Sequence, residues 1–160
     1  MNHIYTEPHT EIRHIYTEHH WRITWITDVE RFFKALRLIV PYGAILYFEG
    51  HKAATSLSRV LQKHRSVRSP RKIAGKRPLL SQHVIFTQEF VDDFVRFLFD
   101  SPRRNRFDHV HCYANDKMLF WFHDALSGGD LVVSRDVKEE NISAFCRELG
   151  PQYLYEGAIV

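Results

Sequence analysis

Cysteine is scarce in this chain, and long apolar runs are absent from it. The two cysteines, Cys112 and Cys146, lack the close spacing of a zinc or redox pair, so we expect two buried, reduced thiols. No apolar stretch approaches the roughly 18 residues that a membrane span needs. The polar N-terminus also lacks the apolar centre of a signal peptide. The sequence therefore predicts a cytoplasmic protein with no membrane partner.

Acidic residues are missing from one continuous segment, between Gly50 and Gln88. This segment carries nine of the 22 lysine and arginine residues, which leaves thirteen to face all 19 acidic residues elsewhere. A formal net charge of +3 therefore combines a segment of +9 with a remainder of −6. Such separation of charge indicates an electrostatic partner and carries no information about the fold.

Signatures of catalysis and of cofactor binding are absent as well. The turn after an expected strand at 44–48 contains one glycine, Gly50, where phosphate loops and dinucleotide sites need two or three. No serine lies in a Gly-x-Ser-x-Gly nucleophile motif. We therefore predict no cofactor and favour a non-enzymatic protein over an enzyme.

Apolar residues are plentiful: 44% of the chain is hydrophobic and twelve residues are phenylalanine. This composition is far from that of disordered chains, and 160 residues suffice for one core. We expect a single domain over 21–160 and an extended N-terminal arm over 1–20. The arm contains His-Ile-Tyr-Thr-Glu twice, at 3–7 and 14–18, and Pro8 between the copies argues against one continuous helix.

Hydrophobic periodicity predicts alternating strands and helices in the first half of the chain. The expected strands cover 21–26, 44–48 and 82–87, and the helices that follow them cover 28–40, 53–64 and 88–99. Because strand–helix–strand units favour parallel neighbours with right-handed crossovers, we expect parallel pairing in this half. This part of the pattern is typical of an α/β protein.

The second half changes to closely spaced strands. Strands are expected at 107–113 and 118–123, joined by a tight turn at Asn115-Asp116, and then at 131–133. A last helix follows and ends at Gly150-Pro151. The expected fold class is therefore α/β with an α+β tendency in the C-terminal half: a mixed sheet, βαβαβα, then an antiparallel β-meander and a final helix.

The stretch 65–81 shows no periodicity, which predicts an exposed basic loop. With the end of the preceding helix it supplies a candidate polyanion-binding strip of Lys63, Arg65, Arg68, Arg71, Lys72, Lys76 and Arg77. No aromatic residue that could stack on bases lies between Gly50 and Ile85, which counts against specific nucleic-acid recognition. The alternative is a solvated loop whose bases meet the acidic remainder of this chain or of a second copy.

Four residues are candidates for a ligand pocket. Glu49 and His51 follow a strand directly, where parallel sheets bind ligands, and could act as base and partner in acid–base chemistry. His109 and His111 lie two apart on one strand, a common spacing of metal ligands. The alternative is a purely structural role for these residues, in which the carboxylate caps a helix and the histidines are partly buried on a sheet face.

The expected hairpin register argues against a metal site. With a two-residue turn, His109 lies opposite Phe122, so His123 points to the other face of the sheet, beside Asp108. Three convergent ligands are then missing, and no metal is predicted. The N-terminal histidines, His3, His9, His14, His19 and His20, could bind Ni²⁺ or Zn²⁺ weakly, but their irregular spacing fits no defined site.

The chain is thus predicted to be a small cytoplasmic protein-interaction or self-association module of unknown role. Its partner would be another protein or a second copy, so a dimer is a specific expectation. The first alternative is binding of a polyanion such as nucleic acid through the basic 63–77 loop. The second is a small-molecule enzyme that uses Glu49 and His51. The residues that we place at a subunit contact are Trp25, the pair Tyr5 and Tyr16, and the terminal Tyr153-Leu154-Tyr155.

Overall fold

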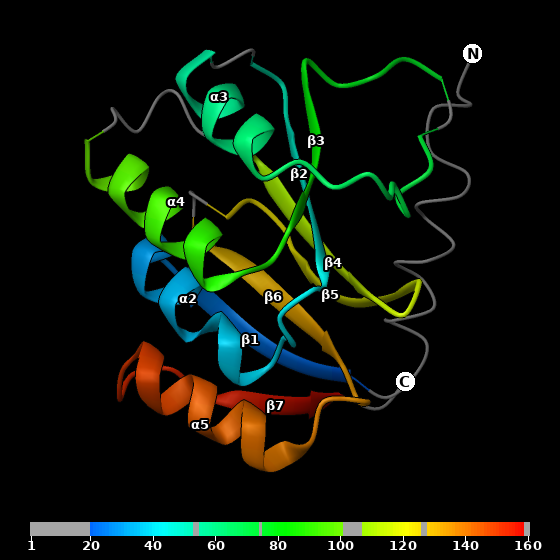
Figure 1. Ribbon diagram of the computed structural model, residues 1–160. Helices are drawn as coiled ribbons and strands as arrows, with labels where there is room; N and C mark the ends of the chain where they lie inside the picture. Colours follow the sequence, from blue (N-terminus) through cyan, green and yellow to red (C-terminus); the bar gives the residue numbers. More distant parts are fainter. Residues whose placement is uncertain (1–19, 53–54, 74, 101–106, 126–127, 159–160) are drawn as a thin grey trace.

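The computed structural model describes residues 20–52, 55–73, 75–100, 107–125 and 128–158 (Figure 1). The elements in chain order are β1 (His20–Ile26), α2 (Val29–Ala35), the 3₁₀ helix η1 (Leu36–Leu38), β2 (Ile45–Gly50), α3 (Thr55–Lys63), β3 (Leu80–Ile85), α4 (Gln88–Asp100), β4 (His109–Ala114), β5 (Lys117–Phe122), β6 (Gly129–Ser134), α5 (Glu139–Leu149) and β7 (Tyr155–Ala158). The predicted α/β class is confirmed, since a seven-strand sheet is combined with four α-helices in the described residues. Strand β7 is not among the strands predicted from the sequence. The N-terminal arm, with its repeated pentapeptide, lies outside the described residues except for His20, which begins β1.

The helices begin and end where local chemistry favours it. Asp28 caps α2, because its side chain accepts a hydrogen bond from the backbone N–H of Arg31 (3.0 Å). The hydroxyl of Thr87 accepts in the same way from the N–H of Phe90 at the start of α4 (3.0 Å). No helix within the described ranges is both long enough and apolar enough to cross a membrane.

The seven strands form one sheet in the order β3-β2-β4-β5-β6-β1-β7, and every neighbouring pair is antiparallel. The expected parallel pairing in the first half, and with it the mixed sheet, is therefore wrong. One reason is that β1 is not a neighbour of β2, since it pairs with β6 and β7.

A second reason lies in the long connection between β2 and β3. Helix α3 brings the chain back along β2, but the segment 64–79 then carries it forward again. Along the way Arg65 forms a bridge with Val84, and the N–H of Ser66 donates to the carbonyl of His83 (3.0 Å). Strand β3 consequently starts opposite Gly50, at the end of β2, and runs antiparallel to it. Strand–helix spacing alone does not reveal this extra pass.

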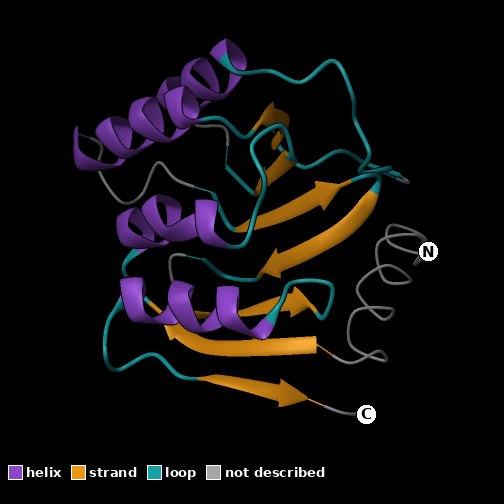
Figure 2. Ribbon diagram, turned by 60° about the horizontal axis from the view of Figure 1, so that its bottom comes forward, coloured by secondary structure: helices purple, strands orange, loops and turns teal. Residues whose placement is uncertain are grey.

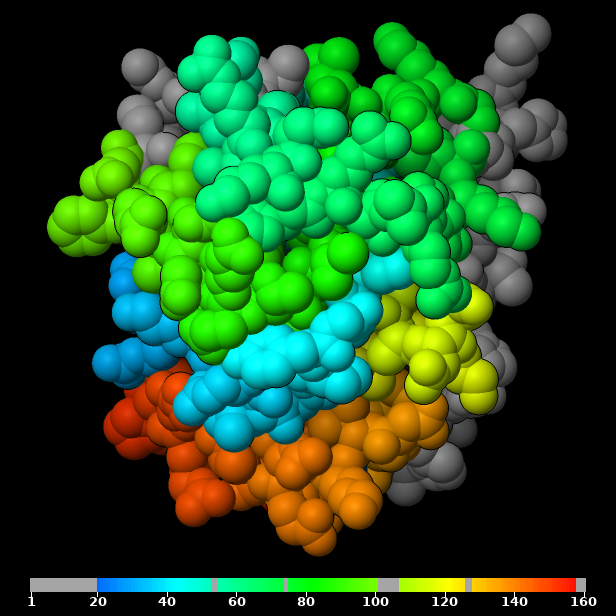
Figure 3. Space-filling view, in the orientation of Figure 1, coloured from blue at the N-terminus to red at the C-terminus, as the bar shows by residue number. Residues whose placement is uncertain are grey.

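The four α-helices of the described residues cover one face of the sheet (Figure 1, Figure 2). In the space-filling view, α3, α4, α2 and α5 follow one another across this side of the molecule (Figure 3). Phenylalanine fills the layer beneath them: Phe32 of α2 lies 4.5 Å from Phe122, and Phe33 lies 4.6 Å from Phe94, between ring centroids. Burial of these rings between helices and sheet is the main source of stability for the fold.

A β-bulge changes the register of the β4–β5 hairpin. The tight turn is confirmed, because Asn115 and Asp116 have φ angles of 51° and 61°. Beyond the turn, however, Tyr113 pairs with Met118 whereas Cys112 pairs with Phe120, so β5 carries an extra residue there. The predicted register is therefore wrong beyond this point, and every later side chain of β5 lies on the face opposite to the one expected.

Candidate functional site

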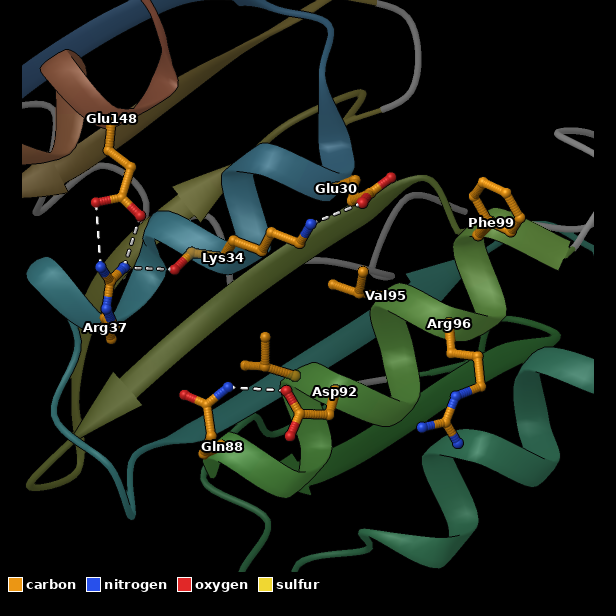
Figure 4. Close-up of a pocket in the computed structure, with 10 residues that line it drawn as sticks. Glu30, Lys34, Arg37, Gln88, Asp92, Val95, Arg96, Phe99 and Glu148 are labelled. Atoms are coloured by element: carbon orange, nitrogen blue, oxygen red, sulfur yellow. Dashed lines mark hydrogen bonds and ion pairs between the residues drawn. The ribbon is translucent and has the colours of Figure 1, made fainter.

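A groove of about 660 Å³ lies on the helical face, between α2 and α4 (Figure 4). Val91, Val95 and Phe99 contribute its apolar surface, and Arg37 of η1 and Glu148 of α5 lie at one end. In Figure 4, Val95 points from α4 toward α2. The volume is within the range of clefts that bind ligands or peptide side chains.

The charged residues around this groove bind one another. Lys34 donates to Glu30 across one helical turn (2.9 Å), and Arg37 makes two hydrogen bonds with Glu148, of 2.8 and 3.1 Å. The amide of Gln88 donates to Asp92 (2.9 Å) (Figure 4). Val91 is buried and Val95 half-buried against the core, so Phe99 contributes most of the exposed apolar surface of the groove.

Phe99 is the most conspicuous of these apolar residues. It lies in the last turn of α4 and is 81% exposed, whereas Phe90, Phe94 and Phe97 of the same helix are buried. A single exposed apolar residue is common on protein surfaces, but one that borders a groove offers a contact for a partner. The sequence predicted a helix over 88–99, but it contains no signal for the groove.

The opposite face of the sheet carries no helix of the described residues and is called the helix-free face in that sense. It collects histidine and aromatic side chains. Tyr47 of β2 pairs with His83 on one side and with His111 on the other, and Trp121 pairs with His111. Ring centroids are 4.7 Å apart for Tyr47 and His83, 5.7 Å for Tyr47 and His111, and 6.3 Å for His111 and Trp121. The bulge in β5 makes this row continuous, since it turns Trp121 to the same face.

Arg71 of the basic segment covers this row. Its guanidinium carbon lies 5.8 Å from the centroid of the Tyr47 ring, and its backbone N–H donates to Nε2 of His83 (3.2 Å). The residue is only 5% exposed. The prediction of an exposed loop over 65–81 is therefore wrong at Arg71, which is removed from the surface that a polyanion could reach.

Burial keeps the histidines of this row neutral. It lowers the pKa of His83 to about 4, with the nearby charges of Arg77 and Arg71 adding to the effect. Burial also lowers the pKa of His111 well below its usual value, again with help from Arg71. Neither ring nitrogen of His111 has a hydrogen-bond partner among the described residues. These side chains act as neutral packing groups at pH 7.

Three of the four candidate pocket residues lie on this helix-free face. Glu49 pairs with His109, next to the pair of Tyr47 and His111. His51 is separate: its Nδ1 lies 2.5 Å from a carboxylate oxygen of Asp108, which also accepts the backbone N–H of His51 (2.8 Å). No hydrogen bond joins Glu49 to His51 within the described ranges, so the structure does not assemble the acid–base pair that the sequence suggested.

The basic strip is divided by its contacts. Lys63 donates to Asp93 of α4 (2.7 Å), and together with His64 it lowers the pKa of that carboxyl. Arg68 binds Asp116 in the hairpin turn. Of the other strip residues, Arg65, Lys72, Lys76 and Arg77 are exposed and have no acidic partner in the part of the chain that the structure describes.

The residues expected at a subunit contact have different positions, and Tyr5 and Tyr16 lie outside the described residues. Trp25 is exposed and has a φ angle of 58°, unusual for such a side chain, within the irregular pairing of β1 with β6. Leu154 is also exposed, but Tyr153 is buried against the core. Trp25 and Leu154 thus remain available for a contact, and Tyr153 does not.

The chain matches no family model, no curated protein and no solved structure. Its function is therefore inferred from its own residues and geometry.

Proposed function

We propose that this chain is a non-enzymatic interaction module that binds a polypeptide segment in the groove between α2 and α4. The segment belongs to a partner protein or to a second copy of the chain. The observation that carries this proposal is the exposure of Phe99 beside the groove. An apolar side chain of the partner that packs on Phe99 would remove its own surface and that of Phe99 from water. No other function has a comparably placed set of residues among those described.

The chemistry of the groove defines its occupant. Val95 and Phe99 favour an aliphatic or aromatic anchor, while the ion pairs of Lys34 with Glu30 and of Arg37 with Glu148 offer polar contacts at the rim. Interfaces typically combine such a buried apolar centre with a polar border. The rim charges of both signs balance, so affinity should depend little on salt.

We place this interaction in the cytoplasm. The support is that Cys112 and Cys146 are both free and buried. Burial raises the pKa of the Cys146 thiol to about 11, which keeps it protonated and unreactive. Two separate thiols of this kind are typical of a reducing compartment.

Light scattering at low and high salt tests whether the occupant is a second copy. We expect association that persists at high salt and is lost in Phe99→Ser, with Glu140→Ser on the exposed side of α5 as the matched control. A monomer under both conditions would assign the groove to a partner protein instead. Association that disappears at high salt and is unaffected by Phe99→Ser would contradict a role for the groove and point to the basic loop.

Polyanion binding is the second candidate, favoured by Lys72, Lys76 and Arg77, which are exposed and have no acidic partner among the described residues. If these three cations contact phosphates, the affinity for single-stranded nucleic acid should fall with salt with a log–log slope of about −2, from roughly −0.7 for each contact. Changing all three residues to serine should abolish the binding of single-stranded nucleic acid. Serine at Lys63 and Arg68, which already bind carboxylates, should reduce it much less. Equal losses in both variants would argue against a specific role for the loop.

A further inference from the structure

A separate cluster of potential metal ligands lies on the helix-free face, where β4 begins and β5 ends. The rings of His109 and His123 stack with centroids 4.4 Å apart and planes 5° from parallel. Asp124 Oδ2 lies 3.1 Å from Nε2 of His123, and its Oδ1 lies 3.8 Å from Nδ1 of His109. One donor atom from each of the three residues falls within 4.8 Å of the other two.

The backbone places these three side chains together. The bulge in β5 turns His123 to the face of His109, and the pairing of the N–H of His123 with the carbonyl of Asp130 (3.1 Å) holds it there. Asp124 then takes a left-handed φ of 47°. In this conformation its N–H donates to Nδ1 of His109 (3.1 Å). The cluster is therefore a product of the sheet geometry rather than a chance meeting of long side chains.

We propose that His109, His123 and Asp124 bind a divalent transition-metal ion of the zinc type, with water completing its coordination. Two imidazoles and one carboxylate form a ligand set that such ions accept, with open positions left for water. Ligand bonds of about 2.0–2.2 Å place donor atoms roughly 3.3 Å from one another, so the wider separations in this cluster would have to close. The side chains of Asp124 and His123 are 54% and 44% exposed, which leaves them room for this movement.

Two features of the cluster oppose binding. An imidazole donates its lone pair in the plane of its ring, so the two stacked rings do not point at one ion, and His123 must rotate out of the stack to bind it. Ligation through Nδ1 of His109 would replace the hydrogen bond from the Asp124 N–H, at a cost comparable to one lost hydrogen bond. A metal bond to two imidazoles and a carboxylate exceeds that cost. The site is distinct from the groove between α2 and α4, because it lies on the opposite face of the sheet.

The test uses the full chain with asparagine at His3, His9, His14 and His19, which removes competing imidazoles, and Co²⁺ as the probe. We expect one equivalent to bind with saturable visible absorption and to be displaced by Zn²⁺. His123→Gln and Asp124→Asn should each weaken binding at least about tenfold, the lower limit seen even for outer-shell partners. His51→Gln, which removes an exposed imidazole that also contacts a carboxylate, should leave the affinity unchanged.

Thermal unfolding of each variant shows whether the fold is retained. If His123→Gln unfolds, the affinity of Asp124→Asn, which changes an exposed side chain, decides whether the cluster binds the metal ion. Failure of the parent chain to bind Co²⁺ would overturn the proposal. So would unchanged affinity in Asp124→Asn, or an equal loss in His51→Gln, which would identify an adventitious surface site.

Discussion

Replacing Gly129 by alanine is expected to destabilise the protein by about 3 kcal/mol or more, at the upper end of the cost of overpacking. A Cβ atom at this position would lie 1.6 Å from the carbonyl oxygen of His123 and 2.7 Å from that of Asp124. Both obstacles are backbone atoms, which cannot rotate away as a side chain can. The start of β6 would have to separate from the end of β5, and the hydrogen bond between the N–H of His123 and the carbonyl of Asp130 would be lost with it.

Gly50 supplies the matched control. Its added Cβ would lie 3.5 Å from side-chain atoms of Leu80 and from Cα of Phe107, which is ordinary van der Waals contact. Gly50→Ala should therefore change the free energy of unfolding by no more than about 1 kcal/mol. Urea unfolding of both variants measures the difference. Equal stability of the two would show that the β5–β6 connection is not as close as described.

Acidification from pH 7 to pH 4 is expected to remove stability through the buried histidines of the helix-free face. His83 has a pKa of about 4 in the folded protein, against an ordinary value of 6.5, so the unfolded chain binds the proton more readily. Stability is therefore complete above pH 6.5 and declines as the pH falls toward 4. The contribution of His83 is on the order of 3 kcal/mol over that interval. His111, whose pKa is also lowered, acts in the same direction.

Urea unfolding at several pH values tests this expectation. His83→Asn should lose stability at pH 7, because the N–H of Arg71 loses its partner, but it should show a shallower decline between pH 6.5 and 4. Asp93 and Asp108, whose pKa values are lowered, begin to lose their contribution only as the pH nears their ordinary value of 3.8, at the acid end of this interval. An unchanged decline in His83→Asn would refute the assignment.

Local periodicity predicted which residues form which elements, because a buried face repeats at a fixed interval along a helix or strand. It predicted the α/β class and the Asn115-Asp116 turn. It did not predict the direction of pairing, since the extra pass of 64–79 along the sheet depends on tertiary contacts. The short edge strand β7 was not predicted for a related reason. Its four residues show no clear strand pattern, and its pairing with β1 is what holds them in a strand.

The sites depended on details that no local pattern records. One extra residue in β5 places His123 on the same face as His109. The prediction of no metal site depends on the two side chains lying on opposite faces, so the reason for it no longer holds. Burial of Arg71 over Tyr47 is a tertiary contact within a segment whose composition indicates an exposed loop. Phe99 continues the apolar character of α4 in the sequence, and only the packed structure shows that it lies outside the core.

The most direct test of the proposed function is photo-crosslinking in cells with a benzophenone amino acid at position 99. The matched control carries the same group at position 140, on the exposed side of α5. We expect a discrete adduct with a polypeptide from position 99 only, and its loss when Val95→Arg places a charge in the groove. No adduct from position 99, or the same adducts from both positions, would contradict the claim that the groove between α2 and α4 is a polypeptide-binding site.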